Sequence, residues 1–119
     1  MYTSSTLALA ALEMLVHLDP EDASREYVAA SAEIPPTVRI APLTPSDLPR
    51  GWRDYPPSPE LADFGMRWVE RGETAILAVP SAVIPQELNY LLNPRHPAFK
   101  RIRVGKAEPF SFDPRLWKG

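Results

Sequence analysis

The chain has 119 residues, a formal net charge of -2 and no cysteine. Its 13 basic and 15 acidic residues are interspersed, so no positive surface is expected for direct contact with a nucleic acid or with an anionic membrane. The lack of cysteine excludes disulfides, thiolate metal sites and cysteine nucleophiles. The length and the 45% hydrophobic content predict a single domain over residues 1–119, with a cytoplasmic location as the default expectation.

The first ordered element is expected in the stretch YTSSTLALAALEMLVHL, residues 2–18. Leu, Ala, Glu and Met favour a helix, which we expect from about Ser5 to Leu18, before Asp19-Pro20. The apolar run is too short for a membrane span, which needs about 20 residues, and it lacks the basic start of a signal peptide. Three hydroxyl residues are candidate N-caps: Thr3, Ser4 and Ser5.

The middle of the chain alternates between strand-like and loop-like segments. REYVAASAEIP (25–35) and TVRIAPL (37–43) are typical of strands, and each is ended by proline. The proline-rich segment 44–59 predicts a surface loop. A second helix is expected over residues 58–72, because Ser58 suits the cap, Pro59 suits the first helical position and Gly72 suits the end.

The C-terminal third predicts the centre of a sheet. TAILAVPS (74–81) is almost wholly apolar, which is typical of a strand buried on both faces. ELNYLLNP (87–94) is a further short ordered piece, and RIRVGKAEPFSFDPRLW (101–117) predicts one or two final strands. Together these segments predict a small, mixed, strand-rich α+β domain.

Glu13 lies in the middle of the most apolar run of the chain. On a helix its neighbours include Leu9, Val16 and His17, so the carboxylate is expected to be partly buried. Burying a carboxylate without partners costs roughly several kcal/mol or forces it to take up a proton. Two interpretations stay open: Glu13 pairs with His17 or with an arginine, or it is a catalytic carboxylate that faces a cleft.

Other candidate residues carry weaker signals. The helix start suits an anion through its free N–H groups, although a plain N-cap is the simpler interpretation. Ser81 follows a buried strand, where open sheets bind ligands, but no G-x-S-x-G motif surrounds it and Ser-His-Asp hydrolysis is not expected. His17 and His96 form no metal-ligand spacing with an acid, so we expect no metal site. We interpret His96 as a turn residue that makes local hydrogen bonds.

Taken together, several stretches resemble one family, the RES-domain toxins. They are YTSSTLALAALEMLVHL near the start, LPRGWRDYP and ELADFGMRWVERGETAILAVPSAVIPQELNYLLNPRHPAF in the middle, and FDPRLW near the end. AVPSAVIPQELNYLLNPRHP is the most specific of them, and the resemblance covers essentially the whole chain. It implies a fold similar to the ADP-ribosyltransferases, which bind NAD in the cleft of a small α/β domain.

The resemblance also implies an activity and a partner. Members of the family resemble toxins of type II toxin–antitoxin systems that degrade NAD or transfer its ADP-ribose. Each is neutralised by a DNA-binding, Xre-like helix-turn-helix antitoxin, and such toxins often form homodimers or hetero-oligomers. By resemblance Glu13, Ser81 and Tyr2 are the catalytic residues, with Ser81 positioning the ribose or the amide rather than acting as a nucleophile. The implied NAD-binding residues are Tyr2, Thr3, Ser4 and Ser81.

One departure from the family pattern bears on activity. In the family an upstream segment with the arginine of the family name precedes the Y-T-S motif, whereas the first arginine here is Arg25. A second interpretation therefore stays open, a catalytically incomplete domain that only binds an antitoxin. The lack of upstream strands is also expected to expose an edge of the sheet.

Overall fold

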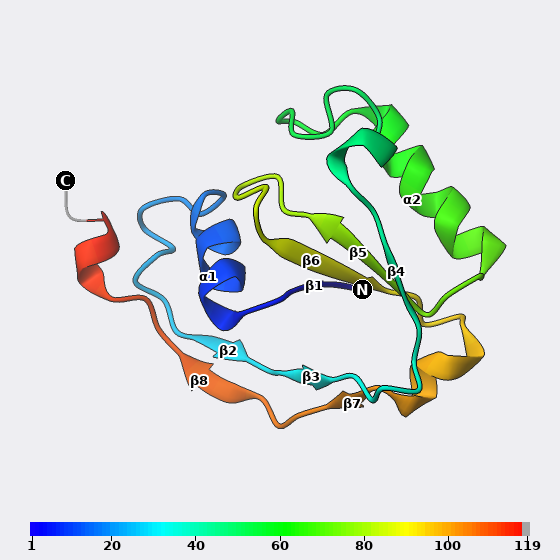
Figure 1. The fold of residues 1–119 in the computed structure, drawn as a ribbon. Helices are drawn as coiled ribbons and strands as arrows, with labels where there is room; N and C mark the ends of the chain where they lie inside the picture. The colour runs from blue at the N-terminus through cyan, green and yellow to red at the C-terminus, as the bar shows by residue number, and fades with distance from the viewer. Residues whose placement is uncertain (118–119) are drawn as a thin grey trace.

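The computed structural model describes residues 1–117, so the last two residues of the predicted 1–119 domain lie outside the described residues. Four strands form the main sheet in the order β1-β6-β5-β4. These strands are β1 (Tyr2–Ser4), β4 (Ile40–Pro42), β5 (Ile76–Pro80) and β6 (Leu88–Leu92). The β1–β6 and β5–β6 pairs are antiparallel and the β4–β5 pair is parallel. With two α-helices beside these strands, the predicted mixed α+β class is confirmed (Figure 1).

Two short antiparallel pairs form a ribbon that runs below the main sheet in Figure 1. In it β2 (Tyr27–Ala29) pairs with β8 (Glu108–Phe110), and β3 (Ala32–Glu33) pairs with β7 (Arg103–Val104). The single strand predicted over 25–35 is therefore two strands, because its halves pair with different parts of the tail. Between them the Gly105 N–H donates to the Ser31 carbonyl at 2.7 Å.

The central position predicted for the apolar segment 74–81 is confirmed. Strand β5 lies between β6 and β4, and four of its five residues are buried. Burial of such apolar surface stabilises the fold by about 25 cal/mol per Å². The main cluster of buried residues joins this strand to its neighbours: Val38, Ala75, Ile76, Leu92 and Ile102.

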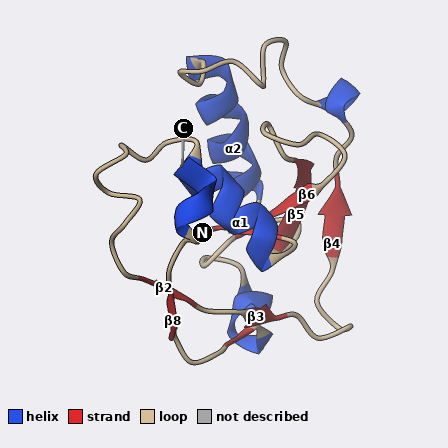
Figure 2. Ribbon diagram, turned by 90° about the vertical axis from the view of Figure 1, so that its left-hand side faces the viewer, coloured by secondary structure: helices blue, strands red, loops and turns tan. Residues whose placement is uncertain are grey.

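Helix α2 (Pro59–Arg71) has the ends that local sequence predicts. The Ser58 hydroxyl accepts from the Leu61 N–H, Pro59 occupies the first turn, and Gly72 ends the helix at φ 60. Left-handed backbone of this kind costs glycine little, because it has no Cβ. In Figure 1 the helix lies on the other side of the main sheet from α1, and in the side view α1 stands in front of it (Figure 2).

Helix α1 (Leu7–Leu15) is shorter than the predicted Ser5–Leu18. Its N-cap is Thr6, whose hydroxyl accepts from the Leu9 N–H at 3.1 Å, so the expected caps at 3–5 were wrong. Residues 2–4 are held instead by strand pairing with β6. Within residues 1–117 neither this helix nor any other is long and apolar enough to span a membrane.

The remaining ordered pieces are 3-10 turns: η1 (Pro45–Asp47), η2 (Pro97–Arg101) and η3 (Pro114–Trp117). The first lies in the proline-rich segment that was expected to be a loop. Apart from η1, residues 44–58 have no regular secondary structure, which agrees with that expectation. The segment therefore crosses from β4 to α2 as an irregular surface loop.

Candidate active site

Glu13 lies at the centre of a hydrogen-bond network between α1 and the strand ends of the main sheet. Its Oε2 accepts from the Ser81 hydroxyl at 2.9 Å and lies 3.3 Å from the Tyr2 hydroxyl. Its Oε1 accepts from the Asn89 side-chain amide at 2.9 Å and from the Ser4 hydroxyl. None of the ion pairs among residues 1–117 involves Glu13. Its neighbours are therefore neutral, and its negative charge is free to act on a bound positive charge.

The register of the main sheet brings these donors together. Asn89 on β6 pairs with Ser4 on β1 and with Val79 on β5. Tyr2 and Ser4 are two residues apart on one strand, so their side chains lie on the same face. Ser81 follows the last residue of β5, at the same end of the sheet. Strand β1 thus delivers two hydroxyl groups, β6 one amide and the residue after β5 one hydroxyl to a carboxylate supplied by α1.

Asn89 is a site residue to which sequence reasoning assigned no role. It is fully buried, its Nδ2 lies 3.0 Å from the Ser4 hydroxyl oxygen, and its Oδ1 accepts from the Tyr2 hydroxyl. A carboxylate only accepts hydrogen bonds, so the amide nitrogen must face Glu13, which fixes the orientation of the side chain. The one available signal was an amide within the otherwise apolar strand sequence LNYLL.

Ser81 is also fully buried, and its hydroxyl makes three hydrogen bonds within the protein. The oxygen accepts from the backbone N–H groups of Val83 and Ile84, both at 3.2 Å, and the proton goes to Glu13. This geometry suits a residue that holds the carboxylate in place. It does not suit a nucleophile that attacks a ligand, because the side chain is fully buried and its oxygen already accepts from two backbone N–H groups.

The ring and the hydroxyl of Tyr2 lie in different environments. The residue as a whole is 61% exposed, but its hydroxyl turns inward and donates to Asn89 beside Glu13. Partial removal from water raises the pKa of this phenol, and the negative charge of Glu13 and the hydrogen bond to it raise the pKa further. The hydroxyl therefore stays a neutral donor at physiological pH, while the exposed ring is available to a ligand.

A cleft of about 430 Å³ opens in front of Glu13. Thr3 lines it, but the Thr3 hydroxyl donates to the Tyr90 carbonyl at 2.8 Å and is not among the donors to Glu13. The volume is within the range of small-ligand sites, roughly 300–1,000 Å³. The lining residues come from β1, from α1 and the turn that follows it, and from the turn after β5: Tyr2, Thr3, Ser4, Ala10, Glu13, Met14, His17, Ala82 and Val83.

Among residues 1–117 neither His17 nor any arginine pairs with Glu13, so that interpretation of the partly buried acid was wrong. The partners of Glu13 are the hydroxyls and the amide described above. The His17 ring instead stacks against Tyr55, with ring centroids 5.1 Å apart and an interplanar angle of 32°. His17 still lines the cleft, one helical turn beyond Glu13.

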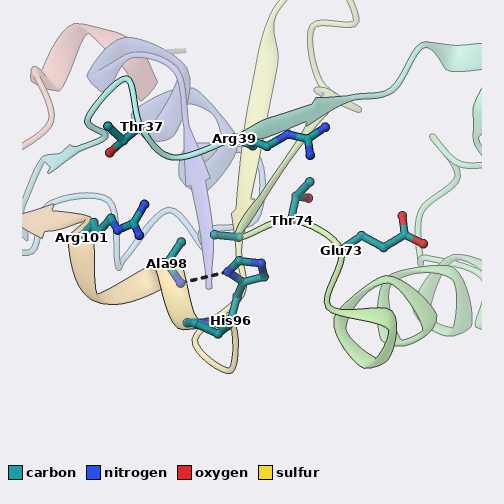
Figure 3. A pocket seen from close by; sticks show the side chains of 9 residues that line it. Thr37, Arg39, Glu73, Thr74, His96, Ala98 and Arg101 are labelled. Carbon is teal, nitrogen blue, oxygen red and sulfur yellow. Dashed lines mark hydrogen bonds between the residues drawn. The ribbon is translucent and has the colours of Figure 1, made fainter.

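A second hollow, of about 240 Å³, lies at the opposite end of β5 and is shown in Figure 3. Its lining includes Thr74, which precedes β5, and His96, which caps η2. The His96 Nδ1 accepts from the Ala98 N–H at 3.0 Å, so the expected local hydrogen bond is confirmed. None of the sequence-predicted site residues lines this hollow. The cleft at Glu13 is therefore the candidate site.

Comparison with known proteins gives one family and several relatives. The family model described as the RES domain matches residues 1–113. The Prs ADP-ribosylating toxin of Sphingobium sp. (strain YBL2) is 36% identical over 118 residues, which are 98% of this chain and 73% of that protein. A protein named Toxin Res from Yersinia enterocolitica is 38% identical, over 98% of this chain and 76% of the relative. Toxin Res of Pseudomonas putida is 38% identical, over 98% and 79%.

The match of the family model over most of the chain agrees with the resemblance drawn from the sequence motifs. The relatives are similar along nearly the whole chain. The residues matched by the family model include every residue of the Glu13 network. The RES domain has a fold like that of the ADP-ribosyltransferases, which agrees with the small mixed α+β domain described above. The chain belongs to the RES domain family.

Proposed function

We propose that this chain is a RES toxin that cleaves the bond between nicotinamide and ribose in NAD+, with Glu13 as its catalytic carboxylate. The observation that carries the proposal is the Glu13 carboxylate, surrounded by neutral donors at the wall of a cleft. The similarity to an ADP-ribosylating toxin supports NAD+ as the substrate, because ADP-ribose transfer consumes NAD+.

The chemistry explains why a carboxylate is needed. When the bond breaks, its electron pair goes to the nicotinamide nitrogen, and positive charge develops on the ribose as in glycoside hydrolysis. A carboxylate that is already oriented stabilises this charge without reorganising at the moment of reaction. Water, phosphate or a protein side chain then forms the new bond to the ribose carbon.

The other residues of the network divide into two roles in this proposal. The exposed ring of Tyr2 stacks against the nicotinamide, and Thr3 adds its part of the cleft wall. Ser4 and Ser81 hold the two oxygens of Glu13, since both hydroxyls donate to it. We therefore assign Ser81 to positioning the carboxylate rather than to touching the ribose, because its side chain is fully buried.

The partner in the proposal is an Xre-like helix-turn-helix antitoxin, in a hetero-oligomer or with the toxin as a homodimer. Three relatives carry the name Toxin Res, and a type II toxin is neutralised by a bound protein. Exposed apolar side chains on and next to α1 supply surface for such a partner close to the cleft: Leu7, Met14 and Val16. Addition of the cognate antitoxin is expected to stop nicotinamide release.

The direct test is to incubate the purified chain with NAD+ and to follow free nicotinamide by chromatography. Glu13→Gln keeps the shape of the side chain but removes the charge, and we expect kcat to fall by about 10²- to 10³-fold. Glu70→Gln, the same change on the exposed surface of α2, is the matched control and should leave kcat unchanged. Full activity of folded Glu13→Gln would refute the mechanism.

The same assay separates the two interpretations left open by the sequence. Nicotinamide release by the wild-type chain supports the enzyme. If the wild-type chain binds its antitoxin but releases no nicotinamide, the chain is a binding module and the enzymatic proposal is wrong.

A further inference from the structure

NAD+ carries two negatively charged phosphate groups, which need positive charge in their binding site. The lining of the cleft includes no lysine or arginine among the described residues, and its one ionisable base is His17. Among the described residues, a cation that could reach the diphosphate is therefore to be sought at the rim of the cleft. The loop between η1 and α2, residues 48–58, is the segment that touches this rim at two points.

The first contact is made by Arg53. Its Nε donates to the Ala82 carbonyl at 2.9 Å. Ala82 lines the cleft and is joined by one peptide bond to Ser81, whose hydroxyl donates to Glu13. The two terminal amino groups of Arg53 have no partner within residues 1–117. A guanidinium with free donors thus lies one hydrogen bond away from the cleft wall.

The second contact is made by Tyr55, which stacks on the cleft-lining His17 although the tyrosine is 78% exposed. The loop is tightly turned around Arg53. Gly51 has φ 77, and its carbonyl accepts from the Asp54 N–H at 2.9 Å. Positive φ is readily adopted by glycine, so this turn is built into the sequence. Arg53 is therefore placed by its own hydrogen bond, by the turn from Gly51 to Asp54 and by the contact of Tyr55 with His17.

We infer that Arg53 binds the diphosphate of the dinucleotide substrate at the rim of the cleft. The inference rests on the proposed function, since it names the part of NAD+ that this residue holds. Arginine suits the task because its planar fork allows Nε to stay on Ala82 while the two terminal groups donate to phosphate oxygens. Lysine at this position has one nitrogen and cannot make both contacts in the same geometry.

A competing explanation is that Arg53 only anchors the loop. The two explanations differ in which ligands they affect. An anchor changes the affinity for all ligands of the cleft or for none, whereas a diphosphate-binding residue affects only the ligands that carry a diphosphate. Nicotinamide riboside has the scissile bond but no phosphate, and ADP-ribose has the diphosphate but no nicotinamide.

The test measures ADP-ribose affinity by calorimetry for the wild type, Arg53→Ala, Arg53→Lys and the matched control Arg50→Ala. We expect Arg53→Ala to weaken binding by about 10- to 100-fold, the range for a lost charge-assisted contact, and Arg53→Lys to be intermediate. Arg50→Ala removes the same charge from the same loop, where Arg50 is exposed and outside the contacts described above, and should bind like the wild type. In turnover, Arg53→Ala should raise KM for NAD+ at unchanged kcat and leave kcat/KM for nicotinamide riboside unchanged.

Equal ADP-ribose affinities of Arg53→Ala and the wild type would overturn the inference. So would the absence of ADP-ribose binding by the wild type, or an equal loss in Arg50→Ala. Failure of the proposed function is a separate result: no nicotinamide would be released from NAD+, yet ADP-ribose binding would still depend on Arg53.

Discussion

The hairpin of β5 and β6 carries a buried hydroxyl and a buried asparagine at each of its two ends. At one end they are Ser81 and Asn89, and at the other Thr74 and Asn93. At the second end Asn93 donates to the Val69 carbonyl at 3.2 Å and accepts from the Arg95 N–H at 3.0 Å. Those two partners are backbone groups.

At the first end the partners of the same residue types converge on one carboxylate. Ser81 and Asn89 each donate to Glu13 at 2.9 Å, and a cleft opens beside it. A buried polar side chain must be hydrogen-bonded wherever it lies, so burial alone does not mark a site. What distinguishes the Glu13 end is that its donors serve a charged group that a ligand can reach.

The asparagines provide the sharpest test of this difference. Asn89→Ala removes a donor to Glu13 and a contact of the Tyr2 hydroxyl, and we expect kcat for nicotinamide release to fall about 100-fold. Asn93→Ala should leave kcat of the folded protein unchanged. Both variants are expected to lose about 1–3 kcal/mol of stability in urea unfolding, because each leaves buried partners unpaired. A large fall of kcat in Asn93→Ala would remove the distinction between the two ends.

The hydroxyls should show the same contrast with a smaller effect. Ser81→Ala removes one of the donors to Glu13 Oε2, and we expect kcat to fall about 10-fold at an unchanged fold, checked by circular dichroism. Thr74→Ala removes a hydroxyl that donates to the Ile76 carbonyl at 3.0 Å, and it should affect only the melting temperature. Full kcat in Ser81→Ala would contradict the proposed difference between the two ends of the hairpin.

The smallest expected effect is the response to alkaline pH. The folded protein holds the phenol proton of Tyr2 more tightly than the unfolded chain, whose ordinary pKa is 10.0. This contribution to stability is fully present below pH 10 and decreases as the pH rises above it. Tyr2→Phe should therefore flatten the loss of stability above pH 10 in urea unfolding. It should also remove the latest step of the absorbance titration of the tyrosines; an unchanged titration curve would contradict the raised pKa.

Parts of the fold follow from local sequence. Ser58, Pro59 and Gly72 mark the ends of α2, because capping and left-handed backbone depend on the residues present there. The apolar run 76–80 required burial on both faces, which placed β5 inside a sheet before its neighbours were known. Glu13 was recognisable as a residue in need of partners, since a carboxylate within an apolar run cannot stay unpaired at low cost.

Other parts depended on contacts between distant segments. The hydroxyl residues at 3–5 are good helix caps in isolation, yet pairing with β6 draws residues 2–4 into strand β1 and moves the cap to Thr6. Asn89 has no local feature of a site residue, and its role depends on a register that sets it opposite Ser4.

The sequence by itself therefore determined the fold class, the central strand, the second helix and the carboxylate that the site is built on. Only the tertiary structure decided which groups surround that carboxylate, among them Asn89 from β6 and not His17. It also decided that Arg53 lies next to the rim of the cleft. The physical reason is that capping and burial preferences depend on neighbouring residues, whereas the donors to Glu13 come from segments up to 76 residues away that only strand pairing brings together.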